Sequence, residues 1–259
     1  MKIKKSIKGV ILAGGNGSRL FPITKVLSKQ LLPVYNKPMI FLSLGLMLSV
    51  GIKDILIIVT PRDIKLFKAL LGNGKKFNCN IKYKIQLKPS GIAEAIKLSK
   101  SFFTTNKILL LLGDNFIFGN NLEHIIIKAI NSNKGSSIFS YAVSNPEHYG
   151  VLNYKNKKLI NIIEKPKKPS SNRAVPGIYI YDQKSIDYVR KMKPSKRGEL
   201  EITDLNNVYL KKQDIEIFNL DKGIVWMDMG TFDSYLEACQ FISATEKRQG
   251  YKIYDFYKD

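Results

Sequence analysis

The chain has 259 residues, of which 44% are hydrophobic and 10% are aromatic. This composition is typical of a globular protein with a hydrophobic core and excludes a disordered chain. The 42 lysines and arginines outnumber the 21 aspartates and glutamates, which gives a net charge of +21. That excess favours anionic partners such as nucleic acid, an acidic membrane or phosphorylated small molecules. Lysines are scattered over every segment, however, so we interpret most of them as a solvated surface.

Neither a secretory leader nor a membrane span is predicted. Lysines interrupt the first apolar residues, and no uncharged run reaches membrane-spanning length. The two cysteines, Cys79 and Cys239, fit no metal-binding spacing, and we expect reduced, buried thiols rather than a disulfide. We therefore expect a cytoplasmic protein.

The first predicted element is a buried parallel strand over residues 7–13, an apolar and β-branched run. It ends at Gly14-Gly15-Asn16-Gly17, where glycine tolerates positive φ and lets another group approach the backbone. Ser18 and Arg19 follow. A glycine turn with exposed N–H groups and an arginine is typical of a phosphate site, although an ordinary strand-to-helix turn also accounts for the glycines. The turn matches neither a Walker A loop nor a dinucleotide fingerprint.

The rest of the chain alternates between strand and helix patterns. Predicted strands are 54–60, 81–86, 107–114, 137–143, 151–154, 159–164, 177–181 and 215–220; predicted helices are 38–50, 61–71, 91–103, 121–129, 183–192, 205–211 and 231–248. This alternation predicts an α/β, Rossmann-like, doubly wound and mostly parallel sheet. The turn at 155–158 predicts an antiparallel hairpin insertion on the substrate side.

Ligands of such sheets bind at the carboxyl ends of the strands. This rule places the Gly14 turn, Gln86 and Asp114 on one rim. Asp114 follows a buried strand directly, so it suits Mg²⁺, which prefers one or two carboxylates together with substrate phosphates; a turn cap is the plain alternative. The last helix offers Thr231 or Asp233 as its cap.

The segment G-G-N-G-S-R-L, followed by S-K-Q-L-L-P-V-Y-N-K-P-M-I, resembles the sugar-1-phosphate nucleotidylyltransferases. The likeness continues through Y-G-V at 149–151, E-K-P at 164–166, K-P-S-K-R-G-E-L-E-I-T-D at 193–204 and W-M-D-M-G-T at 226–231. Within that family the chain is most similar to the glucose-1-phosphate thymidylyltransferases, in a short form with a truncated carboxyl terminus. The resemblance implies synthesis of dTDP-glucose and pyrophosphate from dTTP and glucose 1-phosphate, for dTDP-rhamnose, deoxysugar and surface polysaccharide synthesis.

The resemblance also implies roles for individual residues. The implied nucleotide site comprises Ala13, Gly14, Gly17, Ser18, Arg19, Lys29, Gln30, Gln86 and Gly91. The implied sugar-phosphate site comprises Asn115, Gly150, Glu164, Lys165 and Val175. Asp114 and Asp228 are the implied ligands of Mg²⁺, and Arg19, Lys29 and Lys165 are the implied catalytic residues. The plain alternative for Glu164-Lys165 is a surface ion pair of little energetic value, and the plain alternative for Asp228 is a helix cap, for which Thr231 is the better-placed candidate. The 193–204 segment is expected to be structural.

We expect a single domain, 1–259, made of a nucleotide-binding half (1–118), a sugar-phosphate half (119–230) and a carboxyl-terminal helix and tail (231–259). The resemblance implies a homo-oligomer, a tetramer or a dimer. Departures from the family pattern at Leu87-Lys88, Glu94, Pro176 and Met229 keep two alternatives open: UTP in place of dTTP, or another hexose 1-phosphate. Alternatives from other classes are a basic nucleic-acid-binding protein and an inactive nucleotide-sugar sensor. We predict neither a nucleic-acid partner nor a membrane partner.

Overall fold

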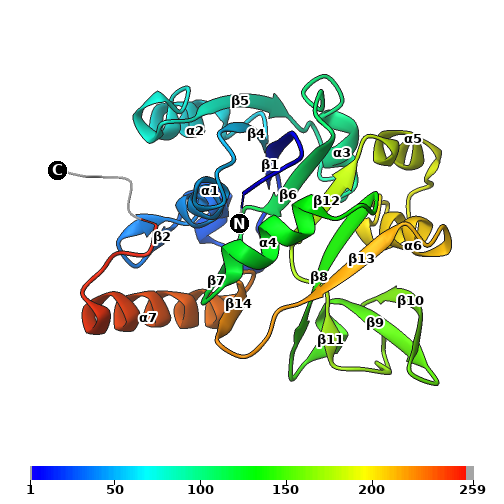
Figure 1. Ribbon diagram of the computed structural model, residues 1–259. Helices are drawn as coiled ribbons and strands as arrows, with labels where there is room; N and C mark the ends of the chain where they lie inside the picture. Colours follow the sequence, from blue (N-terminus) through cyan, green and yellow to red (C-terminus); the bar gives the residue numbers. More distant parts are fainter. Residues whose placement is uncertain (1, 255–259) are drawn as a thin grey trace. The chain divides into compact units, whose positions relative to one another are not determined.

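A computed structural model describes residues 2–254 (Figure 1). The chain forms two compact units, each discontinuous in sequence. We call residues 8–89, 111–119 and 225–254 the glycine-loop unit. Residues 2–7, 90–110 and 120–224 form the hairpin unit.

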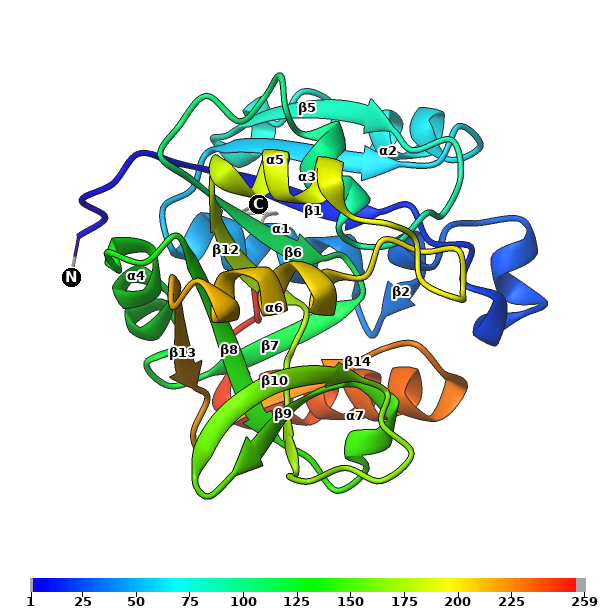
Figure 2. The same cartoon turned by 90° about the vertical axis from the view of Figure 1, so that its right-hand side faces the viewer.

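Three parallel strands form the framework of the glycine-loop unit: β1 (Ile7–Ala13), β4 (Asp54–Val59) and β5 (Asn80–Ile85). β4 pairs with β1 on one side and with β5 on the other, and the three arrows run side by side in Figure 2. Most residues of β1 and β4 are buried, as expected for parallel strands covered on both faces. Helices α1 (Ile40–Ser49) and α2 (Ile64–Leu71) complete the predicted pattern. These strands and helices confirm the sequence predictions to within a few residues.

Several short elements of this unit were not predicted. They are the antiparallel pair β2 (Pro33–Val34) and β3 (Lys37–Pro38), the pair β7 (Asn115–Gly119) and β14 (Ile224–Asp228), and four 3₁₀ turns, η1 (Ser18–Leu20), η2 (Ile23–Lys25), η3 (Lys29–Leu31) and η4 (Lys75–Phe77). β2, β3 and the four 3₁₀ turns are too short to show a hydrophobic period, and β7 and β14 were missed although each has five residues. Two of these turns, η1 and η3, hold residues of the implied nucleotide site.

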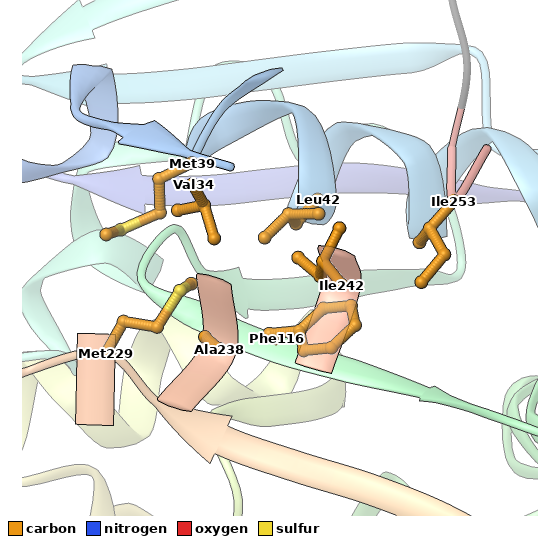
Figure 3. Close-up of a cluster of buried hydrophobic side chains, with 8 residues drawn as sticks. All are labelled: Val34, Met39, Leu42, Phe116, Met229, Ala238, Ile242 and Ile253. Carbon is orange, nitrogen blue, oxygen red and sulfur yellow. The ribbon is translucent and has the colours of Figure 1, made fainter. Parts of the chain in front are cut away.

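The long helix α7 (Phe232–Gln249) is the last helix among the described residues of this unit. Thr231 caps it: the Thr231 hydroxyl accepts the Ser234 N–H, and the Ser234 hydroxyl accepts the Thr231 N–H. This capping box confirms Thr231 as the cap, so the reading of Asp228 as the helix cap is wrong. Figure 3 shows how the helix is held, through a buried cluster of Val34, Met39, Leu42, Phe116, Met229, Ala238, Ile242 and Ile253.

The hairpin unit contains seven strands: six lie in the order β10-β9-β11-β8-β12-β6, and β13 pairs parallel with β8. Their bounds are β6 (Lys107–Leu112), β8 (Ser136–Ala142), β9 (Gly150–Lys155), β10 (Lys158–Glu164), β11 (Arg173–Ala174), β12 (Ile178–Asp182) and β13 (Ile215–Asn219). β9 and β10 pair antiparallel, which confirms the predicted hairpin. Its turn residues, Asn156 and Lys157, have φ of 50° and 61°, as a type I′ turn requires.

The helices of this unit are α3 (Glu94–Leu98), α4 (Leu122–Asn131), α5 (Lys184–Lys191) and α6 (Ile202–Lys211), with a 3₁₀ turn η5 (Pro146–His148). The helix predicted over 91–103 is wrong in extent, because only its centre is helical. Gly91 has a φ of 99°, which no helix accommodates. The Ala93 N–H donates to the Leu200 carbonyl at 3.2 Å, so the chain before α3 is tied to a different segment.

The fold class is mixed α/β with a mostly parallel sheet and added antiparallel strands, as predicted. Both cysteines are free; Cys79 is buried and Cys239 is partly exposed. Over residues 2–254, no helix has both the length and the hydropathy that a membrane crossing needs.

Candidate active site

The glycine turn after β1 lies against Gln86, the residue that follows β5. A Cβ on Gly14 would stand 2.3 Å from Gln86 Oε1, so only glycine lets this amide approach the turn. Gln86 is buried, and its N–H donates to the Val59 carbonyl at 2.8 Å. The structure thus brings Ala13, Gly14 and Gln86 together at the carboxyl ends of the parallel strands, where ligands of such sheets bind.

Gly17 ends the turn in a left-handed conformation, with φ of 63°. Its carbonyl accepts the Thr24 hydroxyl at 2.7 Å, which fixes the turn from behind. Ser18 and Arg19 then begin η1, and both side chains are exposed. A cation and a hydroxyl are therefore presented directly after the glycine turn.

The Arg19 guanidinium lies over Gly230, next to Asp228. A Cβ on Gly230 would stand 2.6 Å from Arg19 Nη2 and 3.2 Å from Asp228 Oδ1. Any larger residue at 230 would therefore displace the guanidinium. The resemblance implied that Arg19 and Asp228 belong to one site, but Gly230, which makes room for them, was not predicted from the sequence.

Lys29, in η3, forms a buried ion pair with Asp114. Only 10% of the Lys29 side chain and 14% of the Asp114 side chain are exposed. Burial alone would raise the pKa of Asp114, but the charge and the hydrogen bond of the Lys29 ammonium outweigh it and hold the pKa below its ordinary value. Asp114 is therefore a carboxylate at neutral pH.

The second carboxylate, Asp228, is the last residue of β14 and is held near the first. The Met229 N–H donates to the Asp114 carbonyl at 3.0 Å, which brings the residues on either side of it, including Asp228, to the start of β7. Asn115 Nδ2 donates to Asp114 Oδ1 at 3.3 Å, and Asn115 Oδ1 accepts the Trp226 indole N–H at 2.7 Å. Trp226 thus orients Asn115, a function that sequence reasoning missed.

Gln30 is buried beside Lys29, and its Oε1 accepts the Ser28 hydroxyl at 2.7 Å. Ser28 was also missed, although it opens the S-K-Q-L-L-P segment. Asn115, implied for the sugar phosphate, belongs to the glycine-loop unit. In contrast Gly91, implied for the nucleotide, belongs to the hairpin unit. A Cβ on Gly91 would stand 2.4 Å from the Leu200 carbonyl oxygen, so close backbone packing requires this glycine.

The hairpin unit brings together Gly150, Glu164 and Val175 of the implied sugar-phosphate site. A Cβ on Gly150 would stand 3.3 Å from Glu164 Oε2 and 3.1 Å from the Thr203 hydroxyl. That hydroxyl donates to Glu164 Oε2 at 2.5 Å. The Val175 N–H donates to the Gly150 carbonyl at 2.8 Å. A side chain at position 150 would therefore lie against the Glu164 carboxylate, which glycine leaves uncovered on the side that faces Gly150.

Lys165 follows Glu164 in a left-handed conformation, with φ of 46°, and its side chain is exposed. Its backbone N–H donates to the Tyr149 carbonyl at 2.9 Å, so the Y-G-V and E-K-P segments are joined directly. Arg197 Nη2 lies 3.6 Å from Glu164 Oε1 and 2.8 Å from Glu201 Oε2. Sequence reasoning missed Arg197 and Thr203, although both lie in the 193–204 segment.

The α/β fold, the glycine turn and the clustered cations and carboxylates are those of a nucleotide-transferring enzyme. The chain matches the family model described as "Nucleotidyl transferase" over residues 8–245, and it belongs to the nucleotidyl transferase family. Within this class, the chain belongs to the family of glucose-1-phosphate thymidylyltransferases, as the following relatives show.

A glucose-1-phosphate thymidylyltransferase of Xanthomonas campestris is 47% identical over 247 residues, which cover 95% of this chain and 84% of that relative. One of Mycobacterium tuberculosis is 44% identical over 248 residues, with 95% and 86% covered. A crystal structure is known of a Bacillus anthracis protein that is proposed to be a glucose-1-phosphate thymidylyltransferase, in complex with a sucrose. It matches with a TM-score of 0.85 at 40% identity and covers 91% of this chain and 95% of that one. A UDP-glucose pyrophosphorylase complexed with UDP-glucose shares the fold, with a TM-score of 0.81 at 22% identity and coverage of 93% and 100%.

Proposed function

We propose that this protein transfers the thymidylyl group of dTTP to glucose 1-phosphate, forming dTDP-glucose and releasing pyrophosphate. The relatives that are 40–47% identical over 95% of the chain support this activity. The observation that carries it is local: Arg19 lies beside Asp228 directly after the glycine turn. Cations and backbone N–H groups at such a turn suit a nucleoside triphosphate. The product serves dTDP-rhamnose, deoxysugar and surface polysaccharide synthesis.

In this reaction a phosphate oxygen of glucose 1-phosphate attacks the α-phosphorus of dTTP. The new oxygen–phosphorus bond forms as the bond to the bridging oxygen breaks in line, and pyrophosphate leaves with the electron pair. The attacking phosphate is already an anion at neutral pH, so no general base is needed. The protein has to position two anions that repel each other and to stabilise the developing charge.

Each implied residue has a task in this scheme. Arg19 and Lys29 stabilise the triphosphate and the leaving group, while Lys165 holds the attacking phosphate. Glu164 accepts hydrogen bonds from sugar hydroxyls, and Gly150 leaves room for the hexose. Gln86 reads the edge of the base, because an amide presents a donor and an acceptor together. Ala13, Gly14, Gly17, Ser18, Gln30 and Gly91 complete the nucleotide site, and Asn115 and Val175 complete the sugar-phosphate site.

The two carboxylates fit Mg²⁺. Among residues 2–254 there is no group of three or more His, Cys, Asp or Glu side chains that could hold a metal ion. Magnesium does not need such a cage, because it retains waters and binds through one or two carboxylates together with substrate phosphates. We therefore assign it to Asp114 and Asp228. When bound, it would neutralise phosphate charge as a Lewis acid.

The base preference has a second candidate. Thymine and uracil present the same hydrogen-bonding edge, so the Gln86 amide suits UTP as well as dTTP. A pyrophosphate-release assay separates the two, with dTTP, UTP, ATP, GTP and CTP each paired with the 1-phosphates of glucose, galactose, mannose and N-acetylglucosamine. We expect the highest kcat/KM for dTTP with glucose 1-phosphate. Release only with another pair would replace this assignment, and no release with any pair would contradict it.

We also propose a homo-oligomer, either a dimer or a tetramer, that works in the cytoplasm. Large apolar side chains exposed on α7, Phe232 at 45% and Leu236 at 55%, support a subunit contact. Sedimentation equilibrium tests this. A monomer at micromolar concentration would contradict the proposed assembly but not the proposed reaction.

A further inference from the structure

A cavity rich in lysine lies within the hairpin unit, and none of the residues assigned to the reaction line it. Its volume is about 290 Å³. Five lysines and two aspartates contribute to its wall: Lys4, Lys5, Lys107, Lys134, Lys184, Asp182 and Asp214. The amino-terminal segment is held there by a hydrogen bond from the Lys4 N–H to Asn131 Oδ1 at 2.8 Å.

Two ammonium groups in this cavity converge on one neutral acceptor. Lys107, the first residue of β6, is 3% exposed, and its Nζ donates to the Ser132 carbonyl at 2.9 Å. Lys5 Nζ donates to the same oxygen. An ammonium has three N–H donors. Within residues 2–254, Ser132 is the only acceptor of Lys107, and neither lysine forms an ion pair.

The neighbouring carboxylates are already engaged. Asp182 accepts the Tyr209 hydroxyl at 2.5 Å and lies 3.7 Å from Lys184 Nζ. Asp214 accepts the Gly135 N–H at 2.8 Å and lies 3.4 Å from Lys184 Nζ. Lys5 and Lys107 thus have donor capacity that the protein leaves unused.

The charge balance around Lys107 follows from this geometry. Burial, together with the nearby Lys5, lowers the pKa of Lys107 to about 8, against the opposing effect of Asp182, Glu216 and Asp214. Glu216 accepts the Ser132 hydroxyl. At neutral pH Lys107 is therefore a buried cation beside a second cation, an arrangement that an anion would stabilise.

We propose that this cavity binds a phosphate-sized anion through the Nζ atoms of Lys5 and Lys107. Its volume lies below the range of roughly 300–1,000 Å³ that is usual for drug-sized ligands, so it suits free phosphate, pyrophosphate or the phosphate group of a small metabolite. Because pyrophosphate is a product of the proposed reaction, the site would let the protein respond to its own product. Anion binding itself does not depend on that reaction.

Binding of inorganic phosphate is measured by isothermal titration calorimetry at fixed ionic strength, with the full chain carrying Arg19→Gln to weaken phosphate binding at the candidate active site. Pyrophosphate and glucose 1-phosphate are titrated in parallel to distinguish the sources of the phosphate group. We expect Lys5→Gln to weaken binding by about tenfold or more, because a charge-assisted hydrogen bond is lost. Lys128→Gln, on the exposed surface of α4, is the matched control and should change nothing.

Two further measurements distinguish loss of the anion site from misfolding of the Lys5→Gln variant. Lys4→Gln, at an exposed wall position, should weaken binding less than Lys5→Gln while circular dichroism stays unchanged. Affinity should fall from pH 7 to pH 9, as Lys107 loses its proton. Undetectable binding of all three ligands, or equal affinity with and without Lys5, would overturn the proposal. Neither result would affect the proposed activity, because that assay depends on residues outside this cavity.

Discussion

Lys29 and Asp114 share a buried position in which neither charge has free access to water. Replacing one partner removes the group that stabilises the other. Breaking a buried ion pair in this way typically costs about 3–5 kcal/mol of folding stability. The pair therefore links stability to the proposed chemistry, and a variant at either position has to be examined for both.

For Asp114→Asn we predict a fall in kcat of about 10²–10³, the usual effect of removing one electrostatic contact from a transition state. The variant should also unfold at a lower urea concentration, because Lys29 loses its countercharge. Asp54→Asn is the control: Asp54 is an exposed carboxylate that accepts a hydrogen bond from Asn80 at 3.1 Å. Unchanged turnover in Asp114→Asn would refute the role of this carboxylate.

Thr203 acts on the sugar side through Glu164, to which its hydroxyl donates at 2.5 Å. We predict that Thr203→Val raises KM for glucose 1-phosphate about tenfold, the worth of a hydrogen bond to a charged group, with little change in KM for dTTP. Thr203→Ser should restore the value. Ser170→Ala, which removes an exposed hydroxyl that bonds Asn153, is the control. An equal rise in both KM values would show a general structural defect instead.

At the level of residues, sequence reasoning located the groups that lie in unbroken motifs. The glycine turn, Lys29 and Asp114 were accessible because each stands next to a recognisable strand or motif. Gly230, Trp226 and Thr203 were not identified as supporting residues, because their importance lies in contacts with residues distant in the sequence: Trp226, for example, bonds Asn115 across 111 positions. No local pattern reports such a contact.

Among the elements, α7 begins with a capping box whose contribution can be measured. Thr231→Ala should lower the free energy of unfolding by about 1 kcal/mol, a typical value for loss of an N-cap side chain. Thr231→Ser should preserve most of the stability, because serine also accepts the Ser234 N–H. Urea denaturation followed by circular dichroism measures both. Equal stability of Thr231→Ala and the wild type would mean that the hydrogen bond at the helix start contributes nothing.

The left-handed backbone conformation in the turn of the β9–β10 hairpin can also be tested by its effect on stability. Lys157 has φ of 61°, a conformation that costs a non-glycine residue roughly 1–2 kcal/mol. Lys157→Gly should therefore stabilise the protein, although the greater backbone freedom of glycine when unfolded offsets part of the gain. Lys155→Gly, the same substitution within strand β9, should destabilise it. The opposite order in urea denaturation would contradict the assignment of this turn.

Long elements with a clear hydrophobic period were predicted well, from β1 to α7. The two-residue strands β2 and β3 were missed because they span too few residues to show a period, and the five-residue strands β7 and β14 were missed as well. The helix predicted over 91–103 was too long because its first residues pack against the Leu200 backbone, a constraint set by tertiary structure. The site depends on several of these short elements, so its framework was less predictable than the sheet.

At the scale of the whole molecule, the net charge of +21 gives a basic protein whose lysines are dispersed. We predict only weak binding to duplex DNA, with a Kd of about 10⁻⁴–10⁻⁶ M at physiological salt, independent of sequence. Fluorescence anisotropy of labelled duplex DNA should show that the affinity falls steeply as the salt concentration rises from 50 to 300 mM. Tight, sequence-dependent binding that dTTP displaces would instead support the nucleic-acid-binding alternative.

The division into two interleaved units could not be read from the sequence. Each unit takes three separate stretches of chain, and their boundaries fall within continuous patterns of strand and helix. The predicted halves, 1–118 and 119–230, and the predicted helix and tail, 231–259, follow chain order, and their functional assignment stays a prediction. The residues implied for the nucleotide site and those implied for the sugar-phosphate site were nevertheless identified from the motifs alone.

The central claim is that this chain joins a thymidylyl group to a sugar phosphate. Phosphorus NMR of the purified protein with dTTP, glucose 1-phosphate and Mg²⁺ tests it most directly. We predict that the dTTP and glucose 1-phosphate signals decline together while dTDP-glucose and pyrophosphate appear in equal amounts, and that Arg19→Gln slows both. Unchanged substrate signals with the folded wild-type protein, or pyrophosphate without the nucleotide sugar, would contradict the account.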